Sequence, residues 1–365
     1  MVRLSDLIKA RGGHVETKST TSVQPSAAPV ASPDEPVVDV MAEQLVKLRK
    51  NVEQTLHETA ALSAPDSHPE SVLCRRAERC VAALAEALLN DAPLSLGEAS
   101  QVAHDIVASL VQDKTLVTRV LAPAQESSLI GNMVHTSIVA TEIGLAIGYR
   151  EDELAQLALA GLVHDIGMFR LPMPLVLRTG RWSRKQISIM QKHTQYGADA
   201  VKRVEKYAWL SDLIIQEHER INGSGYPSGL KGTQIREPAQ VIGLADRFDA
   251  LLRSRSWRKG MLPYEAVRVV LSTEREHFST RVLKGFVRSI TLYPPGTWVK
   301  LSTGSVGMVT SINAQHPLRP VVSVGKRGRR GDLQGNEDVV DLSLAPSLCI
   351  NQAITPVQAH STTTH

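Results

Sequence analysis

The sequence places ionisable side chains on the apolar faces of predicted helices. In the segment EDELAQLALAGLVHDIG, apolar residues recur at four-residue steps from Leu154 to Leu162, and Asp165 follows close to the same stripe. A carboxylate that faces a protein core loses its hydration and requires a cation or a hydrogen-bonded partner to offset that cost. Asp165 therefore needs such a partner, and His164 stands next to it.

Other helical segments repeat this arrangement, with a histidine or a carboxylate next to or in step with an apolar stripe. The residues that share this placement are His135, His193, Glu217, His218, Asp246 and Asp249. One inward histidine is usually satisfied by its own neighbours, but several helices that each offer an inward histidine or acid would each need a separate explanation. A shared metal site accounts for all of them together.

The donor types narrow the choice of metal. Imidazoles and carboxylates suit first-row cations such as iron, manganese, zinc and nickel. The three cysteines show no CxxC spacing, so neither a disulfide framework nor a thiolate zinc cage is supported. At least six candidate ligands leave room for two ions, with Asp165 as a bridge. Two ions about 3.5–4 Å apart are an arrangement used for phosphoester hydrolysis.

The rest of the sequence divides the chain into five predicted parts. Residues 1–37 include a stretch rich in Ser, Thr, Ala and Pro, which is typical of a disordered linker. Residues 38–121 have helical periodicity, and their role stays open between packing, sensing and homodimer formation. Residues 125–290 carry the inward-facing groups. Residues 291–348 alternate apolar and polar residues between glycine turns, as short strands do, and residues 349–365 are predicted to form a disordered tail.

Charge and hydropathy limit the partners and the compartment. A net charge of +4 over 365 residues does not indicate a nucleic-acid polymer as a partner, and the basic cluster at 326–330 is interpreted as a solvated turn. The N-terminus lacks the apolar core of a signal peptide, and no stretch reaches the roughly 18 uninterrupted apolar residues of a membrane helix. We therefore expect a cytoplasmic protein without a transmembrane segment.

The order of the inward-facing residues resembles the HD-GYP family, a bacterial branch of the HD metal-dependent phosphohydrolases. The motifs that carry the resemblance are His135, the pair His164-Asp165, His193, HER at 218–220, GSGYP at 223–227 and ADRFDAL at 245–251. HD alone is a weak signal, but this order and spacing together with GYP are specific. The resemblance spans about residues 125–290 and extends into YPPGTWVKL at 293–301.

The resemblance implies a mostly α-helical fold, an HD-type helical bundle, here with an N-terminal helical region and a small C-terminal β-rich appendage. It implies hydrolysis of cyclic di-GMP to pGpG, GMP or both by hydroxide activated on two divalent ions, most commonly iron or manganese, with zinc or nickel as alternatives. The implied metal ligands are His135, His164, Asp165, His193, His218 and Asp246, with Glu217 as a further candidate. Asp165 is also the implied catalytic residue.

The resemblance also implies where the substrate and a partner bind. Arg255 and Arg258 would bind the substrate phosphates, which agrees with the fit between guanidinium groups and phosphate oxygens, and Tyr226 would contact the substrate. The motif loop, Gly223, Gly225, Tyr226 and Pro227, borders the active site in the family. It is also linked there to contacts with diguanylate cyclase (GGDEF) domains.

Four positions depart from the family pattern. Gly131 stands where members with three metals carry Glu, Met168 stands at the Lys of HDxGK, Glu217 replaces the first His of HHE, and Asn222 replaces the Asp of DGxGYP. Two alternatives therefore stay open beside hydrolysis of cyclic di-GMP. One is a degenerate module that binds cyclic di-GMP or a cyclase partner without turnover, and the other is hydrolysis of another nucleotide. The filled ligand positions favour hydrolysis of cyclic di-GMP.

Overall fold

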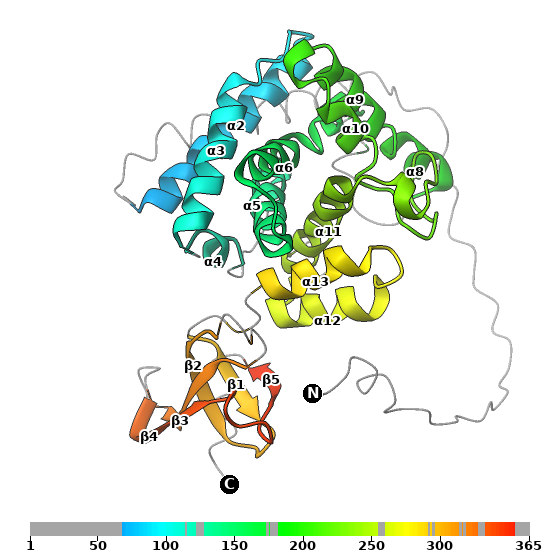
Figure 1. The fold of residues 1–365 in the computed structure, drawn as a ribbon. Helices are drawn as coiled ribbons and strands as arrows, with labels where there is room; N and C mark the ends of the chain where they lie inside the picture. The colour runs from blue at the N-terminus through cyan, green and yellow to red at the C-terminus, as the bar shows by residue number, and fades with distance from the viewer. Residues whose placement is uncertain are drawn as a thin grey trace, which may run out of the picture. The chain divides into compact units, whose positions relative to one another are not determined.

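The chain forms a bundle of helices followed by a five-stranded sheet (Figure 1), which confirms the predicted mostly α-helical fold with a small β-rich appendage. The computed structural model describes residues 68–113, 115–121, 128–172, 175, 182–254, 260–290, 293, 296–313, 316, 319–327 and 333–354. The predicted linker at 1–37 lies outside these residues.

The helical part runs from Pro69 to Ser289. Its α-helices are α2 (Pro69–Leu89), α3 (Gly97–Gln112), α4 (Thr115–Leu121), α5 (Leu129–Ile147), α6 (Glu151–Val163), α8 (Arg184–Met190), α9 (His193–Lys202), α10 (Leu210–Ile214), α11 (Glu237–Leu252), α12 (Pro263–Thr273) and α13 (Thr280–Ser289). Its 3-10 turns are η1 (Ile166–Arg170), η2 (Glu205–Tyr207) and η3 (Gly232–Gln234). Local chemistry marks several starts: proline occupies the first turn of α2, α11 and α12, and a serine caps α5, α8 and α13.

Helix α5 forms the core of the bundle, because α2, α4, α6, α11 and α13 all pack against it. Its buried residues are not confined to one stripe, as expected for a helix that is surrounded by others. Its length and composition would allow it to cross a membrane, but 72% of its most apolar 18-residue stretch is buried inside the protein, as in a core helix. Helices α2 and α3 share one hydrophobic core with α5 and α6. The predicted boundary between residues 38–121 and 125–290 stays a prediction.

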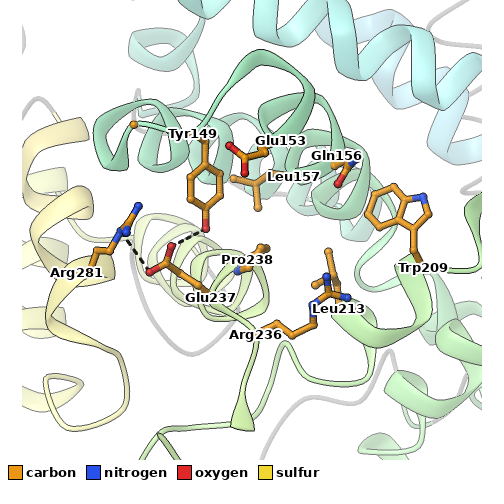
Figure 2. A pocket seen from close by; sticks show the side chains of 11 residues that line it. Tyr149, Glu153, Gln156, Leu157, Trp209, Leu213, Arg236, Glu237, Pro238 and Arg281 are labelled. Carbon is orange, nitrogen blue, oxygen red and sulfur yellow. Dashed lines mark hydrogen bonds and ion pairs between the residues drawn. The ribbon is translucent and has the colours of Figure 1, made fainter. Parts of the chain in front are cut away.

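The first turn of α11 is fixed by two other segments. Figure 2 shows Tyr149 and Arg281 directed toward Glu237: the Tyr149 hydroxyl donates to Oε1 at 3.0 Å, and Nε of Arg281 lies 3.4 Å from Oε2. These side chains border a pocket of about 350 Å³ that Trp209 also lines. The contacts set the position of the helix whose later turn carries Asp246.

The sheet is antiparallel throughout, in the order β4-β3-β2-β1-β5. Its strands are β1 (Trp298–Leu301), β2 (Val306–Ser311), β3 (Val321–Arg327), β4 (Leu333–Asp341) and β5 (Ile350–Ile354). The prediction of a disordered tail from residue 349 is wrong for β5, which pairs with β1 from Leu301–Ile350 to Trp298–Ile354. INQAI is too short and too polar to indicate a strand alone, and it becomes a strand by pairing with the edge of β1.

Replacing Phe248 with alanine tests the packing that holds α11. The ring is fully buried and meets Phe286 of α13 edge to face, with centroids 4.9 Å apart. Its removal leaves a cavity, so we expect the free energy of unfolding in urea to fall by about 3–5 kcal/mol. The control Val111→Ala, at a side chain that is 65% exposed, should change it by less than about 0.5 kcal/mol. Equal losses in both variants would contradict this assignment.

Candidate metal centre

Six of the predicted ligand residues converge inside the helical bundle. His164 and Asp165 lie at the junction of α6 and η1, His193 begins α9, Glu217 and His218 follow α10, and Asp246 lies in α11. Because these elements are far apart in the sequence, only the packing of the bundle brings the six side chains together.

Glycine at position 167 lets two of these elements approach closely. A Cβ at Gly167 would lie 2.0 Å from the carbonyl oxygen of His193 and 2.4 Å from the backbone nitrogen of Gly197. Any larger residue would push η1 away from α9. The absence of a side chain at Gly167 therefore sets the spacing between Asp165 and His193.

The two most deeply buried histidines are oriented by backbone carbonyls. Nδ1 of His164 lies 2.8 Å from the carbonyl oxygen of Gly161, and Nδ1 of His193 lies 2.7 Å from that of Met190. A carbonyl only accepts hydrogen bonds, so Nδ1 carries the proton in each neutral ring and Nε2 keeps its lone pair. Both lone pairs point into the cluster, as metal ligation requires.

The ligand atoms form two groups that share Asp165. One group is His164, Asp165 and Asp246, and the other is Asp165, His193, Glu217 and His218; within each group the donor atoms lie within 4.8 Å of one another. Oδ1 of Asp165 lies 3.1 Å from Nε2 of His193, and Oδ2 lies 3.7 Å from Nε2 of His164. Asp165 thus offers one oxygen to each group, which is the geometry of a bridging carboxylate.

Glu217 spans the same two groups. Its Oε1 lies 3.8 Å from Nε2 of both His193 and His218, and its Oε2 lies 3.9 Å from Nε2 of His164. Both oxygens of Glu217 and Nε2 of His164 are buried without a hydrogen-bond partner among the described residues. Buried lone pairs without donors are costly, and a divalent cation would satisfy all three atoms. The residues present therefore fit a metal centre.

When no metal is bound, some of the ligand residues bind protons instead. Burial raises the pKa of Glu217 to about 7, against the opposing effect of His164. Burial disfavours protonation of His193, but the Asp165 carboxylate outweighs it and raises the pKa to about 10. Burial and the neighbouring His193 lower the pKa of His218 to about 3. Metal binding at these ligands must therefore release protons.

His135 lies beside the two groups rather than in either of them, within the part of the chain that the structure describes. Its Nδ1 is 3.4 Å from Oδ1 of Asp249. The side-chain amide of Asn132 donates to Asp246 at 3.3 Å and to Asp249 at 3.0 Å. It thereby connects Asp249 to the predicted ligand Asp246. Neither Asn132 nor Asp249 is among the ligands that the sequence motifs predict. Their signal was positional: Asp249 is three residues after Asp246, and Asn132 three before His135.

The motif loop folds over one of the histidines. The Tyr226 ring stacks on His218 with centroids 4.8 Å apart, and Tyr226 N–H donates to the His218 carbonyl. The buried Glu219 carboxylate accepts N–H bonds from Ser228 at 2.7 Å and Leu230 at 2.9 Å, which closes the loop. A Cβ at Gly225 would lie 2.4 Å from the His218 carbonyl oxygen, so this approach requires glycine.

The remaining predicted residues have mixed outcomes. Met168 lies half-buried in η1 and donates its N–H to the carbonyl of Asp165 at 2.9 Å, beside the cluster. Gly223 and Pro227 lie in the motif loop with Tyr226. Arg255 and Arg258 lie outside the described residues, so their role at the substrate phosphates stays a prediction.

Residues 84–282, more than half of the chain, match the HD domain family. The chain belongs to this family. Residues 298–362 match the KOW domain associated with the HD domain. The solved structure of Bd1817, an HDG"Y"P protein from Bdellovibrio bacteriovorus, has a TM-score of 0.51 at 17% identity over 68% of this chain and 80% of its own. The predicted HD-type bundle and the resemblance to the HD-GYP branch are thereby confirmed.

Two curated relatives are named after a substrate. The cyclic di-GMP phosphodiesterase PA4108 of Pseudomonas aeruginosa is 28% identical over 278 residues, which are 75% of this chain and 66% of the relative. The cyclic di-GMP phosphodiesterase response regulator RpfG of Xanthomonas campestris is 28% identical over 165 residues, 44% of this chain and 43% of the relative. This HD-family chain thus spans less than two thirds of either relative.

The pKa of His193 predicts how the stability of chelator-treated protein depends on pH. The folded value of about 10 exceeds the ordinary value of 6.5, so between about pH 7.5 and 9.5 the folded state keeps a proton that the unfolded state has lost. The free energy of unfolding should therefore fall by about 1.4 kcal/mol per pH unit for this proton. His164 adds to the fall, because the Glu217 and Asp165 carboxylates outweigh its burial and also raise its pKa well above 6.5. His218 adds no slope there, because it is neutral in both states.

Metal-loaded protein is the matched control for this measurement. Because bound cations displace the protons from the ligands, the slope should be absent after loading. Urea titrations of both forms at several pH values measure it. Identical slopes in the two forms would contradict the assignment of His193 to the centre.

Proposed function

We propose that the chain is a metal-dependent phosphodiesterase that hydrolyses cyclic di-GMP to pGpG, GMP or both. The observation that carries the proposal is the convergence of three histidines and three carboxylates into two groups that share Asp165. The names of the two curated relatives support cyclic di-GMP as the substrate. The family to which the chain belongs supports hydrolysis of a phosphoester.

Each group of ligands suits one divalent ion. His164 and Asp246 would hold one ion and His193 and His218 the other, with Asp165 between them. Two such ions activate water and neutralise charge on phosphoryl oxygens. Asp165, which would contact both, is the catalytic residue in this proposal.

Glu217 favours hard cations in this centre. A histidine at this position would add a neutral donor, whereas the carboxylate of Glu217 adds a negative charge and reaches both groups. Carboxylate-rich sites suit manganese and iron better than the softer members of the series, so these two are the proposed ions, with zinc and nickel as alternatives.

The substrate and partner sites extend the proposal beyond the ligands. Arg255 and Arg258 would bind the phosphates through paired N–H donors. Tyr226, which stacks on His218 beside the cluster, would contact the bound nucleotide. Pro227 lies exposed on the motif loop, which leaves that loop accessible to a diguanylate cyclase (GGDEF) domain. Formation of a homodimer through the helices before residue 121 stays a prediction.

A turnover assay tests the proposal. Anaerobically purified protein, loaded separately with iron(II), manganese(II), zinc(II) or nickel(II), is incubated with cyclic di-GMP, and the products are separated by chromatography. We expect pGpG or GMP with iron or manganese, and we expect Asp165→Ala to reduce the rate to that of buffer because both ion sites lose an oxygen ligand.

Three outcomes would overturn it. Intact cyclic di-GMP with all four metals would refute hydrolysis, and tight binding without product would indicate a module that only binds the nucleotide. Cleavage of cyclic di-AMP or 3'3'-cGAMP in parallel reactions that leave cyclic di-GMP intact would assign a different substrate.

The variant Met168→Lys tests the effect of the lysine that stands at this position in the family pattern. Met168 lies beside Asp165, where a lysine would bring positive charge toward the substrate phosphate. One charge-assisted contact contributes about 1–3 kcal/mol in a transition state, so kcat/KM for cyclic di-GMP should rise by about 5- to 150-fold. Met168→Leu keeps the apolar volume and should change the rate by less than about threefold. A rise in both variants would show that charge is not the cause.

A further inference from the structure

A buried carboxylate that is absent from both ligand groups lies directly behind them. Asp249 in α11 is 0% exposed. Its Oδ1 accepts from Nε of Arg253 at 2.9 Å and lies 3.4 Å from Nδ1 of His135. Its Oδ2 accepts from Nδ2 of Asn132 at 3.0 Å. Both oxygens of Asp249 therefore face groups on other parts of the bundle.

The position of this carboxylate is set independently of His135. Arg253 is 4% exposed, and its Nη2 lies 2.8 Å from Oδ1 of Asp249 and donates to the carbonyl of Val120 in α4 at 2.6 Å. A buried guanidinium that is fixed at both ends holds its carboxylate partner in one orientation. The carboxylate is thus a rigid acceptor toward which the imidazole of His135 can turn.

Asn132 connects Asp249 to Asp246, which is a predicted metal ligand. It lies one turn before His135 in α5, and its side-chain amide donates both to Asp249 and, at 3.3 Å, to Oδ1 of Asp246. The amide therefore connects α5 and α11 at the level of the centre. Movement of Asp249 would disturb Asp246 through this bridge.

An acceptor at Nδ1 is what the other oriented histidines of the centre have. His164 and His193 each direct Nδ1 at a backbone carbonyl, which leaves Nε2 free for a cation. Nδ1 of His135 makes no hydrogen bond among the described residues, and the Asp249 carboxylate is the acceptor in the corresponding place, 3.4 Å away. A carboxylate behind a ligating imidazole fixes its tautomer and makes it a stronger donor to a cation.

We propose that Asp249 is a positioning residue for the metal centre, which holds His135 with Nε2 available as a ligand and steadies Asp246 through Asn132. This inference rests on the proposed function only in taking Asp246 as a metal ligand. It adds His135, which lies outside both ligand groups, as a further metal ligand whose orientation is set by Asp249.

Metal affinity of purified protein tests the proposal without a turnover measurement. Asp249→Ala should weaken the binding of one of two manganese ions by about 10- to 100-fold, as measured by competition with a chelator and by elemental analysis. The second ion should keep its affinity, because His193 and His218 do not contact Asp249. In Asp249→Asn the amide oxygen still serves Arg253 and His135, so this variant should bind better than Asp249→Ala.

Glu274→Ala is the matched control. Glu274 is a nearly buried carboxylate that likewise lies between an arginine and a histidine, 2.7 Å from Arg247 and 2.8 Å from Nδ1 of His277, but it belongs to neither ligand group. Its loss should lower the stability of the protein and leave both metal affinities unchanged. This separates positioning of a ligand from general loss of a buried ion pair.

The outcomes distinguish this inference from the proposed function. Wild-type affinities in both Asp249 variants, or an equal loss in Glu274→Ala, would overturn the role of Asp249. Wild-type protein that binds two ions and leaves cyclic di-GMP intact would overturn the proposed function and leave the role of Asp249 standing. If circular dichroism shows that Asp249→Ala does not fold, the comparison of Asp249→Asn with wild type decides the question. Weaker binding of one ion is expected in Asp249→Asn as well, because Asn132 loses its acceptor.

Discussion

The rest of the structure is arranged around a set of buried lone pairs that have no hydrogen-bond donor among the described residues. The oxygens of Glu217 and Nε2 of His164 lie inside an otherwise apolar bundle, where an unpaired polar atom is expensive. In the metal-free protein, attraction between protonated histidines and carboxylates partly offsets this cost. Against the effect of burial, this attraction raises the pKa of His193 and lowers the pKa of Asp165. A divalent cation bound by these residues would resolve the same conflict more completely.

Around that set, the bundle is arranged to keep the donors pointed inward. Backbone carbonyls orient His164 and His193, the Tyr226 ring covers His218, and Asp249 lies behind His135. Each of these contacts comes from a different part of the chain. The centre is therefore preorganised by tertiary packing, which holds the donor side chains in a fixed geometry.

The helical fold and most of the residues at the centre could be predicted from the sequence. The helical fold followed from apolar periodicity, and the convergence of Asp165, His193 and His218 was indicated by polar residues on apolar stripes. The sequence places Asp249 on the face of Asp246 but does not predict its role, because a carboxylate that supports a ligand and one that is a ligand have the same helical periodicity. Strand β5 was missed because its pairing partner lies far away in the chain, and a five-residue alternation carries little information alone.

The sequence by itself determined which chemistry the chain is able to support: nitrogen and oxygen donors without thiolates, in the order of the HD-GYP motifs, with Glu217 and Met168 as departures. Only the tertiary structure decided how these donors are divided. It showed that Asp165 and Glu217 each face two groups, and that His135 lies beside Asp249. The reason is physical, since helical periodicity specifies the face on which a side chain lies, whereas distances between donor atoms depend on how closely separate helices approach, and that is set by contacts such as Gly167 against α9.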